Sequence, residues 1–537
     1  MLRAMITPEP LALSPRALAV GLVLSAVVAM SSTYAGLKVG GVYWPIITAT
    51  LTAMGVLRLF GGVSRQEINV AGTAASTGGL LAAGVLFTVP ALWLLGVQIS
   101  ASEIMLIALV GGVLGVLLSL PLRHEMIERL ELPYPDGTAT ARMIAAGDEG
   151  GAKLKTLLAA AAGAGLFALV RDVAKLLPPV VNLDTLGAKA ARSFSFGSSI
   201  SLVPLAGGFL IGPKFTGVWF LGGALSYLVA LPILIGRGDF ETKAEAITSL
   251  TQPFGIGVIV GASLGYFLFK GLPAFFPLLG RLLAGTPRRR AWGALGLAGL
   301  VLSVALVLVV PFWLAFVAVL AAFVVATIAA RIAGELNIDP MEIFAIAILL
   351  LVLAVIRLEA RPAVILAAIL CIAAGMAGDF MQDLKAGKLV GTPPGAQIRA
   401  QLLSVISSSI VIGLVLPALH ATSTIGSIEL PAPQAVALAG IVKAGVITGP
   451  LAWGAVVGLL LALASLAFGQ GILPIALGIG LYAPIELSCP LLVGGLLRAW
   501  AEHRGNTEPA RLLAAGAIGG EGLLGAGLAL LRMSGVG

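Results

Sequence analysis

Long apolar runs separated by short polar connectors make up most of the chain. The plainest runs are Ala17–Gly36, Val42–Phe60, Glu103–Pro121, Phe312–Ala333 and Ile398–Leu419. A helix needs roughly 20 apolar residues to cross the ~30 Å hydrocarbon core of a bilayer, and these runs have about that length. Because peptide groups in lipid must satisfy one another, such runs predict helices. The sequence therefore predicts an all-α polytopic membrane protein.

Four further apolar stretches are interrupted by glycine and proline, which break straight helices. They are 69–96, 200–213, 434–450 and 474–490. With these interruptions, the pattern predicts about 16 transmembrane or re-entrant helices, within a range of roughly 14 to 17.

The composition agrees with burial in lipid. Hydrophobic residues make up 59% of the chain and charged residues only 11%, against about 25% charged residues in soluble domains. The net charge of +8 comes from short basic clusters between apolar runs, such as Arg288–Arg290. This placement is typical of cytoplasmic membrane anchors and argues against nucleic-acid binding. We expect a multi-pass protein of the inner (plasma) membrane whose first span, Ala17–Gly36, is retained.

The chain resembles itself in three places, in the same order in each half. Residues 34–38 resemble 332–335, residues 143–170 resemble 384–415, and residues 202–225 resemble 473–497. One match alone could arise by chance between leucine-, alanine- and glycine-rich segments, but the shared order favours a duplication. We therefore predict an N-terminal half, 1–285, and a C-terminal half, 286–537. Parallel and inverted repeats both stay open.

The matching broken segments 202–214 and 473–486 are candidate parts of a substrate site. In duplicated transporters the substrate binds near the midplane, where interrupted helices offer free N–H and C=O groups. Gly208, Lys214 and Tyr482 lie in these segments and are candidate substrate-binding residues. The alternative is that the glycines only allow helices to pack closely.

The run 69–79 is a second candidate. Asn69, Thr73 and Ser76 recur at helical spacing, so they share one face of a helix. A polar face within lipid must meet water, ligand or another helix. We therefore count these three residues as candidate substrate contacts, with hydrogen bonding between helices as the alternative.

Charged residues inside apolar runs are candidates for ion coupling. Glu486, Glu521, Lys214 and Lys443 are the clearest cases. A charge at bilayer depth is costly and usually faces a cavity or a partner, and a carboxylate there can exchange protons. Glu486 and Glu521 are therefore candidate proton-coupling residues, and Lys443 joins the candidate substrate contacts. The alternative is a structural ion pair with Lys214 or Lys443.

Two more charged groups lie at the ends of apolar runs. Arg171, Asp172 and Lys175 end one run, where they can pair with one another or extend to the interface. Asp379 and Asp383 lie one helical turn apart at the end of another run. Asp379 is a further proton-coupling candidate. The two carboxylates could also bind magnesium diphosphate as in membrane prenyltransferases, although the second acidic cluster of those enzymes is missing.

Other chemistry finds no support in the sequence. No G-x-x-x-x-G-K-[ST] loop occurs, which excludes a pump with its own ATP site. His124, His420 and His503 are scattered, and Cys371 and Cys489 lie far apart, outside any C-x-x-C motif. We expect no metal site and no cofactor.

Several motifs that follow one another along nearly the whole chain resemble those of a known family. They are Tyr34–Lys38, Asn69–Leu92, Leu132–Ala139, Arg331–Glu335, Gly378–Gly387, and Pro484–Gly495 with Gly520-Glu521. On these motifs the chain resembles the prokaryotic branch of the oligopeptide transporter (OPT) superfamily, which is related to the yellow-stripe-like metal-chelate carriers. The N-P-G and K-I-P-P-R signatures of the plant and fungal peptide carriers are absent, so the resemblance does not specify the substrate.

The resemblance implies a proton-coupled secondary active transporter rather than an enzyme. It would import short peptides, or peptide-like and metal-chelate compounds, by alternating access. Tyr34 and Lys38, in the first motif, become candidate substrate-binding residues. The expected partners are the solute, protons and the lipid bilayer, with no nucleic acid, and the oligomeric state stays open, a homo-oligomer included. The alternatives are a passive channel and a magnesium-dependent prenyl- or glycosyltransferase that uses Asp379 and Asp383.

Overall fold

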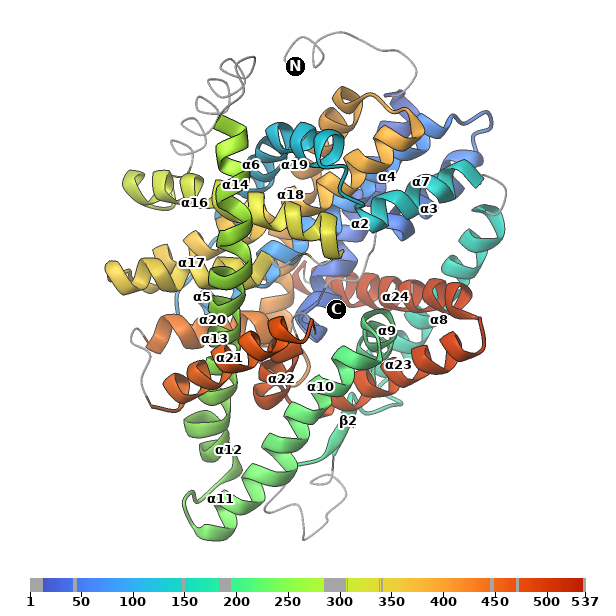
Figure 1. Ribbon diagram of the computed structural model, residues 1–537. Helices are drawn as coiled ribbons and strands as arrows, with labels where there is room; N and C mark the ends of the chain where they lie inside the picture. Colours follow the sequence, from blue (N-terminus) through green and yellow to red (C-terminus); the bar gives the residue numbers. More distant parts are fainter. Residues whose placement is uncertain are drawn as a thin grey trace.

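The computed structural model of the chain consists almost entirely of helices (Figure 1). It describes residues 13–41, 46–146, 150–182, 195–283, 308–337, 341–444, 449–469 and 473–534, with the single residues 306 and 339. Within this part of the chain, eleven helices are long and apolar enough to cross a membrane, and five shorter apolar helices accompany them. The predicted class, an all-α polytopic membrane protein, is confirmed, and the number sixteen stays a prediction.

The first part of the chain alternates long helices with short ones. Its elements are α2 (Pro15–Val39), α3 (Ile46–Arg58), α4 (Arg65–Leu86), α5 (Pro90–Leu94), α6 (Ala101–Arg123), the π-helical η1 (His124–Arg129), α7 (Pro135–Ala146), α8 (Gly150–Asp172), β1 (Val180–Asn182), β2 (Gly197–Ser199), α9 (Leu202–Ile211), α10 (Pro213–Gly223), η3 (Ala224–Ala230), α11 (Leu231–Arg237), α12 (Lys243–Ala246), η4 (Ile247–Thr251), α13 (Gln252–Tyr266), η5 (Phe267–Gly271) and α14 (Leu272–Leu283). Strands β1 and β2 pair antiparallel. Ser14, Ser64 and Ser100 cap α2, α4 and α6 by accepting a hydrogen bond from a backbone N–H of the first turn. Such caps satisfy N–H groups that a helix leaves unpaired, so they define where each helix begins.

The second part of the chain continues this alternation. Its elements are α16 (Phe312–Leu336), α17 (Met341–Val355), α18 (Ala360–Val390), α19 (Pro394–Thr422), α20 (Pro433–Ala444), α21 (Gly449–Ala467), α22 (Leu473–Tyr482), α23 (Ile485–His503) and α24 (Thr507–Met533). Left-handed residues end α16 and α18, namely Asn337 with φ +58° and Gly391 with φ +79°. This conformation stops a helix abruptly, so the chain changes direction within a few residues.

Helix α18 lies at the centre of the fold. It has 31 residues, and 94% of its most apolar stretch is buried inside the molecule. Helices α4, α6, α7, α16 and α17 pack around it, and Figure 1 shows it enclosed by elements from both parts of the chain. Residues near its end are therefore protected from lipid by protein.

The same kinds of helix pairs occur twice. Helix α2 packs on α4, and α16 packs on α18. Helix α8 packs on α24, and α21 on α13; likewise α9 packs on α23, and α22 on α10 (Figure 1). In these last four pairs, one helix comes from before residue 284 and the other from after residue 308, so the two parts of the chain interlock. The predicted boundary at 285/286 lies outside the described residues.

Glycines let the paired helices touch backbone to backbone. A Cβ atom at Gly78 of α4 would lie 2.0 Å from the carbonyl oxygen of Ser25 in α2. At Gly261 of α13 it would lie 1.8 Å from the carbonyl oxygen of Ala455 in α21. Because apolar attraction between helices is weak in lipid, close packing at small residues supplies much of their association.

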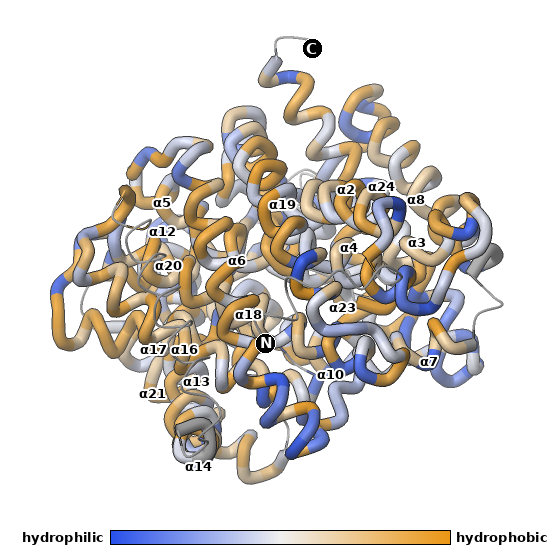
Figure 2. The backbone as a smooth tube through the Cα atoms, turned by 90° about the horizontal axis from the view of Figure 1, so that it is seen from above, coloured by the Kyte–Doolittle hydropathy of each residue, from blue (hydrophilic) through white to orange (hydrophobic). Residues whose placement is uncertain are grey.

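The surface of the molecule is also apolar. Figure 2 shows hydrophobic residues along most of the tube, with hydrophilic ones mainly at helix ends and connections such as those around α7. Large side chains face outward, among them Trp453 at 70% and Phe468 at 78% exposure. A water-soluble protein rarely exposes so much large apolar surface, so lipid must cover these helices.

Candidate functional site

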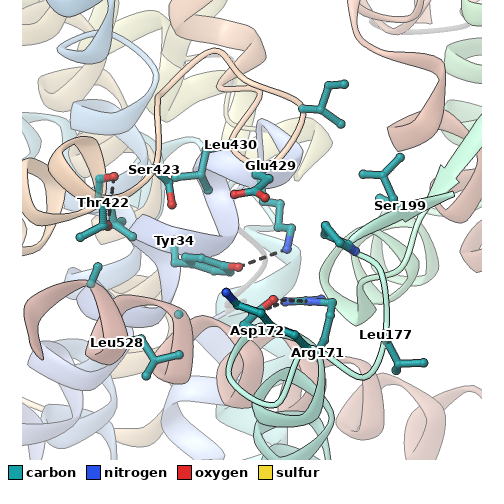
Figure 3. A pocket seen from close by; sticks show the side chains of 18 of the residues that line it. Tyr34, Arg171, Asp172, Leu177, Ser199, Thr422, Ser423, Glu429, Leu430 and Leu528 are labelled. Atoms are coloured by element: carbon teal, nitrogen blue, oxygen red, sulfur yellow. Dashed lines mark hydrogen bonds and ion pairs between the residues drawn. The ribbon is translucent and has the colours of Figure 1, made fainter. Parts of the chain in front are cut away.

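A cavity of about 730 Å³ lies where α2, α8 and α19 end, beside the second half of α24. Tyr34 and Lys38 line it from α2, Arg171 and Asp172 from α8, and Thr422 from α19. Figure 3 shows the labelled side chains from these elements around one common space. A volume of this size is within the range of small-molecule binding sites.

Glu521 lies in the middle of α24, beside this cavity, and its side chain is 0% exposed. Its Oε1 accepts hydrogen bonds from Lys38 Nζ at 3.1 Å and Arg171 Nη1 at 2.9 Å. Ser201 Oγ donates to the same oxygen at 2.6 Å, and the backbone N–H of Leu202 donates to Oε2 at 2.8 Å. Ser201 caps α9, so the positive end of this helix also faces the carboxylate.

The two cations at Glu521 have further partners. Arg171 donates from Nε and Nη2 to the two carboxylate oxygens of Asp172, each at 2.6 Å, and from Nη1 to the carbonyl oxygen of Ile200 at 2.8 Å. Lys38 Nζ donates to the hydroxyl of Tyr34 at 3.1 Å. We call Lys38, Arg171, Asp172 and Glu521 the Glu521 ion cluster. Its formal charges cancel, which is the condition under which buried charges are tolerated.

Glycines beside Glu521 let the neighbouring helices approach closely enough for this cluster to form. A Cβ atom at Gly520 would lie 1.9 Å from the carbonyl oxygen of Ala161 in α8. On the side facing α2, a Cβ at Gly522 would lie 2.6 Å from the carbonyl oxygen of Ser31. Both neighbouring helices therefore pack directly on the backbone of α24, and this approach brings Arg171 and Lys38 to Glu521.

The outer part of the cavity carries exposed charges of both signs. Lys175 follows α8, Arg532 lies in the last turn of α24, and Glu429 belongs to the loop after α19. Glu429 faces the same space as Tyr34 and Asp172 (Figure 3). A solute in the cavity would therefore meet both cations and carboxylates.

A second polar region lies between α4, α18 and the start of α19. Asp383 of α18 is 0% exposed, and its Oδ2 accepts a hydrogen bond from Ser76 Oγ at 3.0 Å. Gln397 Nε2 donates to Thr73 Oγ1 at 3.1 Å and to the carbonyl oxygen of Asp383 at 2.7 Å. The predicted polar face of residues 69–76 thus meets two other helices at Thr73 and Ser76.

Three more carboxylates belong to this region, and the group is centred on Asp379. Asp136 and Asp383 are close enough to Asp379 to repel its charge, and Asp379 repels that of Asp339. A Cβ atom at Gly378 would lie 2.9 Å from Oδ2 of Asp339, so this connector residue packs directly on α18. We call Asp136, Asp339, Asp379 and Asp383 the Asp383 acid cluster.

The Asp383 acid cluster is short of bases. As far as the chain is described, Asp339, Asp379 and Asp383 form no ion pair with lysine or arginine, and no three potential ligands are arranged to hold a metal ion. Burial raises the pKa of Asp136, and burial together with the neighbouring Asp379 raises the pKa of Asp339 well above its usual range. Asp136 lies in the first turn of α7, which is not one of the membrane-crossing helices, and Asp339 lies between α16 and α17. In both places this shift favours the protonated form.

Of the predicted site residues, Tyr34, Lys38 and Glu521 meet at the cavity. Glu521 is ion-paired, but with Lys38 and Arg171 rather than with Lys214 or Lys443. Thr73, Ser76 and Asp379 belong to the other polar region. Asn69 is fully buried one helical turn before Thr73.

The other predicted residues lie away from the cavity. Gly208 lets α9 pack directly on the backbone of α23, since a Cβ there would lie 2.0 Å from the carbonyl oxygen of Leu491. Lys214 at the start of α10 and Lys443 at the end of α20 are exposed.

Tyr482 and Glu486 lie on either side of the break between α22 and α23. Tyr482 is buried and donates a hydrogen bond to the carbonyl oxygen of Pro433. Glu486 lies beside β2, where a Cβ at Gly197 would be 2.9 Å from its Cγ. Neither residue lines the cavity.

Sequence reasoning lets Arg171 and Asp172 pair with one another or extend to the interface, and it does not single out Ser201 or Glu429; the structure shows the pair. The structure shows Arg171 to be 3% exposed and bound to Glu521. The charged pair at the end of an apolar run is the only local signal for this role. Which acid it meets depends on the packing of α8 on α24.

Comparison with known proteins agrees with this architecture. The family model described as "OPT oligopeptide transporter protein" matches residues 12–276 and 290–532. A protein of Haemophilus influenzae with the name "Putative oligopeptide transporter" is 29% identical over an alignment 591 positions long, which covers 93% of this chain and 92% of that protein. The chain therefore belongs to the OPT oligopeptide transporter family and is a multi-pass membrane transporter rather than an enzyme.

Proposed function

We propose that the protein is a proton-coupled secondary active transporter of the plasma membrane. It imports short peptides, or peptide-like and metal-chelate compounds, by alternating access. The observation that carries this proposal is the cavity of about 730 Å³ beside the fully buried Glu521, with a lining that includes charges of both signs.

The charges of the cavity suit a peptide-like solute. A free peptide has a carboxylate at one end and an ammonium group at the other. Lys38 and Arg171 are cations that suit the carboxylate, and Asp172 and Glu429 are anions that suit the ammonium group. The name of the Haemophilus relative supports the same class of solute.

The coupling residues that we propose are Glu521, Glu486 and Asp379. Glu521 adjoins the cavity, whereas Asp379 belongs to the Asp383 acid cluster. The two regions lie towards opposite ends of α19, because Gln397 contacts Asp383 and Leu419 lines the cavity. At 1.5 Å rise per residue this separation is roughly 33 Å, about the thickness of the hydrocarbon core. The acid cluster is therefore suited to exchange protons on the side away from the cavity.

We also propose that residues 1–285 and 286–537 are the two copies of a duplicated unit. The recurring pairs support this idea, because α8 on α24 has its counterpart in α21 on α13. In this pairing the counterpart of α8 is α21, whereas the sequence match of 143–170 with 384–415 would make it α19. The matched segments 202–225 and 473–497 correspond to α9–α10 and α22–α23, which exchange partners across the two parts. Rocking of interlocked copies is a common route to alternating access.

Uptake into proteoliposomes tests the function. With an alkaline interior, we expect saturable uptake of at least one member of a panel of di- to hexapeptides and metal chelates, abolished by a protonophore. Lys38→Met should lower uptake at least tenfold, a loss of about 1.4 kcal/mol of binding or transition-state stabilisation. Lys155→Met, at an exposed lysine of α8, is the matched control. Uptake that rises linearly with concentration and ignores the protonophore would instead identify a passive channel.

A further inference from the structure

The carboxylate of Glu521 occupies a complete anion-binding site. Four donors hold it: the side chains of Lys38, Arg171 and Ser201 and the backbone N–H of Leu202. Of these four groups, the side chains of Lys38 and Arg171 belong to residues that also line the cavity. The same cations therefore face both an internal carboxylate and any solute that enters.

Of the two cations that hold Glu521, Lys38 is the one with binding capacity left. An ammonium group has three donors, and the Lys38 bonds to Tyr34 and Glu521 account for two of them. Its side chain is 12% exposed, whereas that of Arg171 is 1% exposed and already bound to Asp172, Ile200 and Glu521. Past the exposed Lys175 and Arg532 of the outer cavity, a solute carboxylate would consequently contact Lys38 before Arg171.

We propose that a carboxylate of the solute replaces Glu521 as the counter-ion of Lys38, and that Glu521 takes up the driving proton when it is displaced. This inference rests on the proposed function and specifies how the solute and the proton are coupled. One ion pair breaks and one forms, and one proton from the acidic side bonds to a carboxylate oxygen of Glu521. The solute keeps its own charge throughout.

Charge balance explains why the two events belong together. Lys38, Arg171, Asp172 and Glu521 sum to zero charge before the solute arrives. A third carboxylate, brought by the solute, would leave the buried cluster with one uncompensated negative charge, which is costly at bilayer depth. Protonation of Glu521 restores the sum to zero. One proton is therefore bound for each carboxylate that binds at Lys38.

Among the charged groups that the neighbouring elements bring together here, Glu521 is the one that accepts the proton. Helix α2 presents Lys38 and Tyr34, and α8 presents Arg171 and Asp172. Asp172 retains both its bonds to Arg171 in this scheme.

Helices α9, α19 and α23 also pack against α24. The first presents Ser201 and a backbone N–H to Glu521. On the other two, His420 stacks on Trp93 and Arg498 pairs with Glu502. Glu486 of α23 lies beside β2 and does not line the cavity.

Proton uptake on binding is the direct test. Purified protein in detergent is mixed with trialanine or with trialanine amide in weakly buffered solution near pH 7 containing a pH indicator, and peptide binding is measured in parallel. For the wild type we expect close to one proton taken up per trialanine bound, and affinity that falls by up to about tenfold per pH unit as the pH rises. The amide has no carboxylate and should bind at least tenfold more weakly, without proton uptake.

The variant Glu521→Gln imitates the protonated state. It should bind trialanine without proton uptake and with affinity independent of pH, while losing gradient-driven accumulation in proteoliposomes. Glu508→Gln is the matched control on the same helix, because Glu508 is exposed and pairs with Lys153; it should behave like the wild type.

Three outcomes would overturn the inference. Binding of trialanine to the wild type without proton uptake contradicts the exchange and leaves the proposed transport of peptides standing. Equal binding and proton uptake with trialanine amide would also contradict the exchange and leave the proposed transport of peptides standing. This comparison uses only the wild-type protein, so it does not depend on the folding of a variant. If the wild type binds and transports no peptide of the panel, the proposed substrate and the inference fall together.

Discussion

The Glu521 ion cluster and the Asp383 acid cluster are both buried groups of charge, but they are built in opposite ways. In the first, each carboxylate contacts a cation, and the four formal charges cancel. In the second, Asp383 is held by the hydroxyl of Ser76, and Asp379 is surrounded by other carboxylates. The contrast lies in the partners of the acids, because long apolar helices contribute to both regions.

This difference in the partners of the acids determines what each region can do. An acid with a fixed cation keeps its charge until something competes for that cation, which suits a solute-dependent switch. An acid among acids exchanges protons without such a competitor, which suits a path for protons. The variants below break or sharpen this contrast, from the largest expected effect to the smallest.

Arg171→Met should damage the Glu521 ion cluster most. It removes the base shared by Glu521 and Asp172 and leaves buried negative charge, at a cost of about 3–5 kcal/mol. We expect a large fall in the thermal unfolding midpoint in detergent. Addition of Glu521→Gln should restore part of the stability, because it removes the charge left unpaired. If Arg171→Met alone is as stable as the wild type, the ion pairs contribute little to the stability of the fold.

Gly520→Ala tests whether the ion cluster depends on close helix contact. The new Cβ would lie 1.9 Å from the carbonyl oxygen of Ala161, so α8 must move away from α24. We expect a loss of about 1–3 kcal/mol in thermal unfolding, typical of overpacking. Gly527→Ala is the control on the same helix, since its Cβ would find its nearest neighbour, Met30 Cε, at 3.5 Å. Equal effects of the two substitutions would argue against this role of Gly520.

Asp379→Asn probes the Asp383 acid cluster without removing an ion pair. We expect gradient-driven uptake to fall about tenfold, equivalent to about 1.4 kcal/mol, while exchange of solute across the membrane in the absence of a gradient continues. The unfolding midpoint should hardly change, because no base is left unpaired. Asp239→Asn, at an exposed connector, is the control. A parallel loss of exchange and uptake would point to a structural role instead.

Asp339→Asn should show the smallest effect, and one that depends on pH. Because the pKa of Asp339 is raised in the folded protein, the folded state keeps its proton to a higher pH than the unfolded chain does. This group therefore lowers stability as the pH rises above the usual aspartate value, and the asparagine variant escapes that loss. We expect the variant to unfold about 1–3 °C higher than the wild type at pH 8, with a smaller difference at pH 5. A constant difference at both values would contradict this explanation.

Much of the membrane fold follows from the sequence alone. The length of an apolar run determines whether a helix can cross the bilayer, and this depends only on neighbouring residues and lipid. The same local logic identifies Glu521 as a costly charge within an apolar run. The family motifs further single out Tyr34 and Lys38, which do line the cavity.

Only the tertiary structure decides which charges meet. Lys38 and Arg171 reach Glu521 across 483 and 350 residues of sequence, through the packing of α2 and α8 on one side chain. The sequence offered Lys214 and Lys443 equally as partners, yet both are exposed. Periodicity and run length describe a helix by itself, whereas an ion pair also needs two particular helix faces in contact. That choice arises from close packing between the two parts of the chain, and no local pattern encodes it.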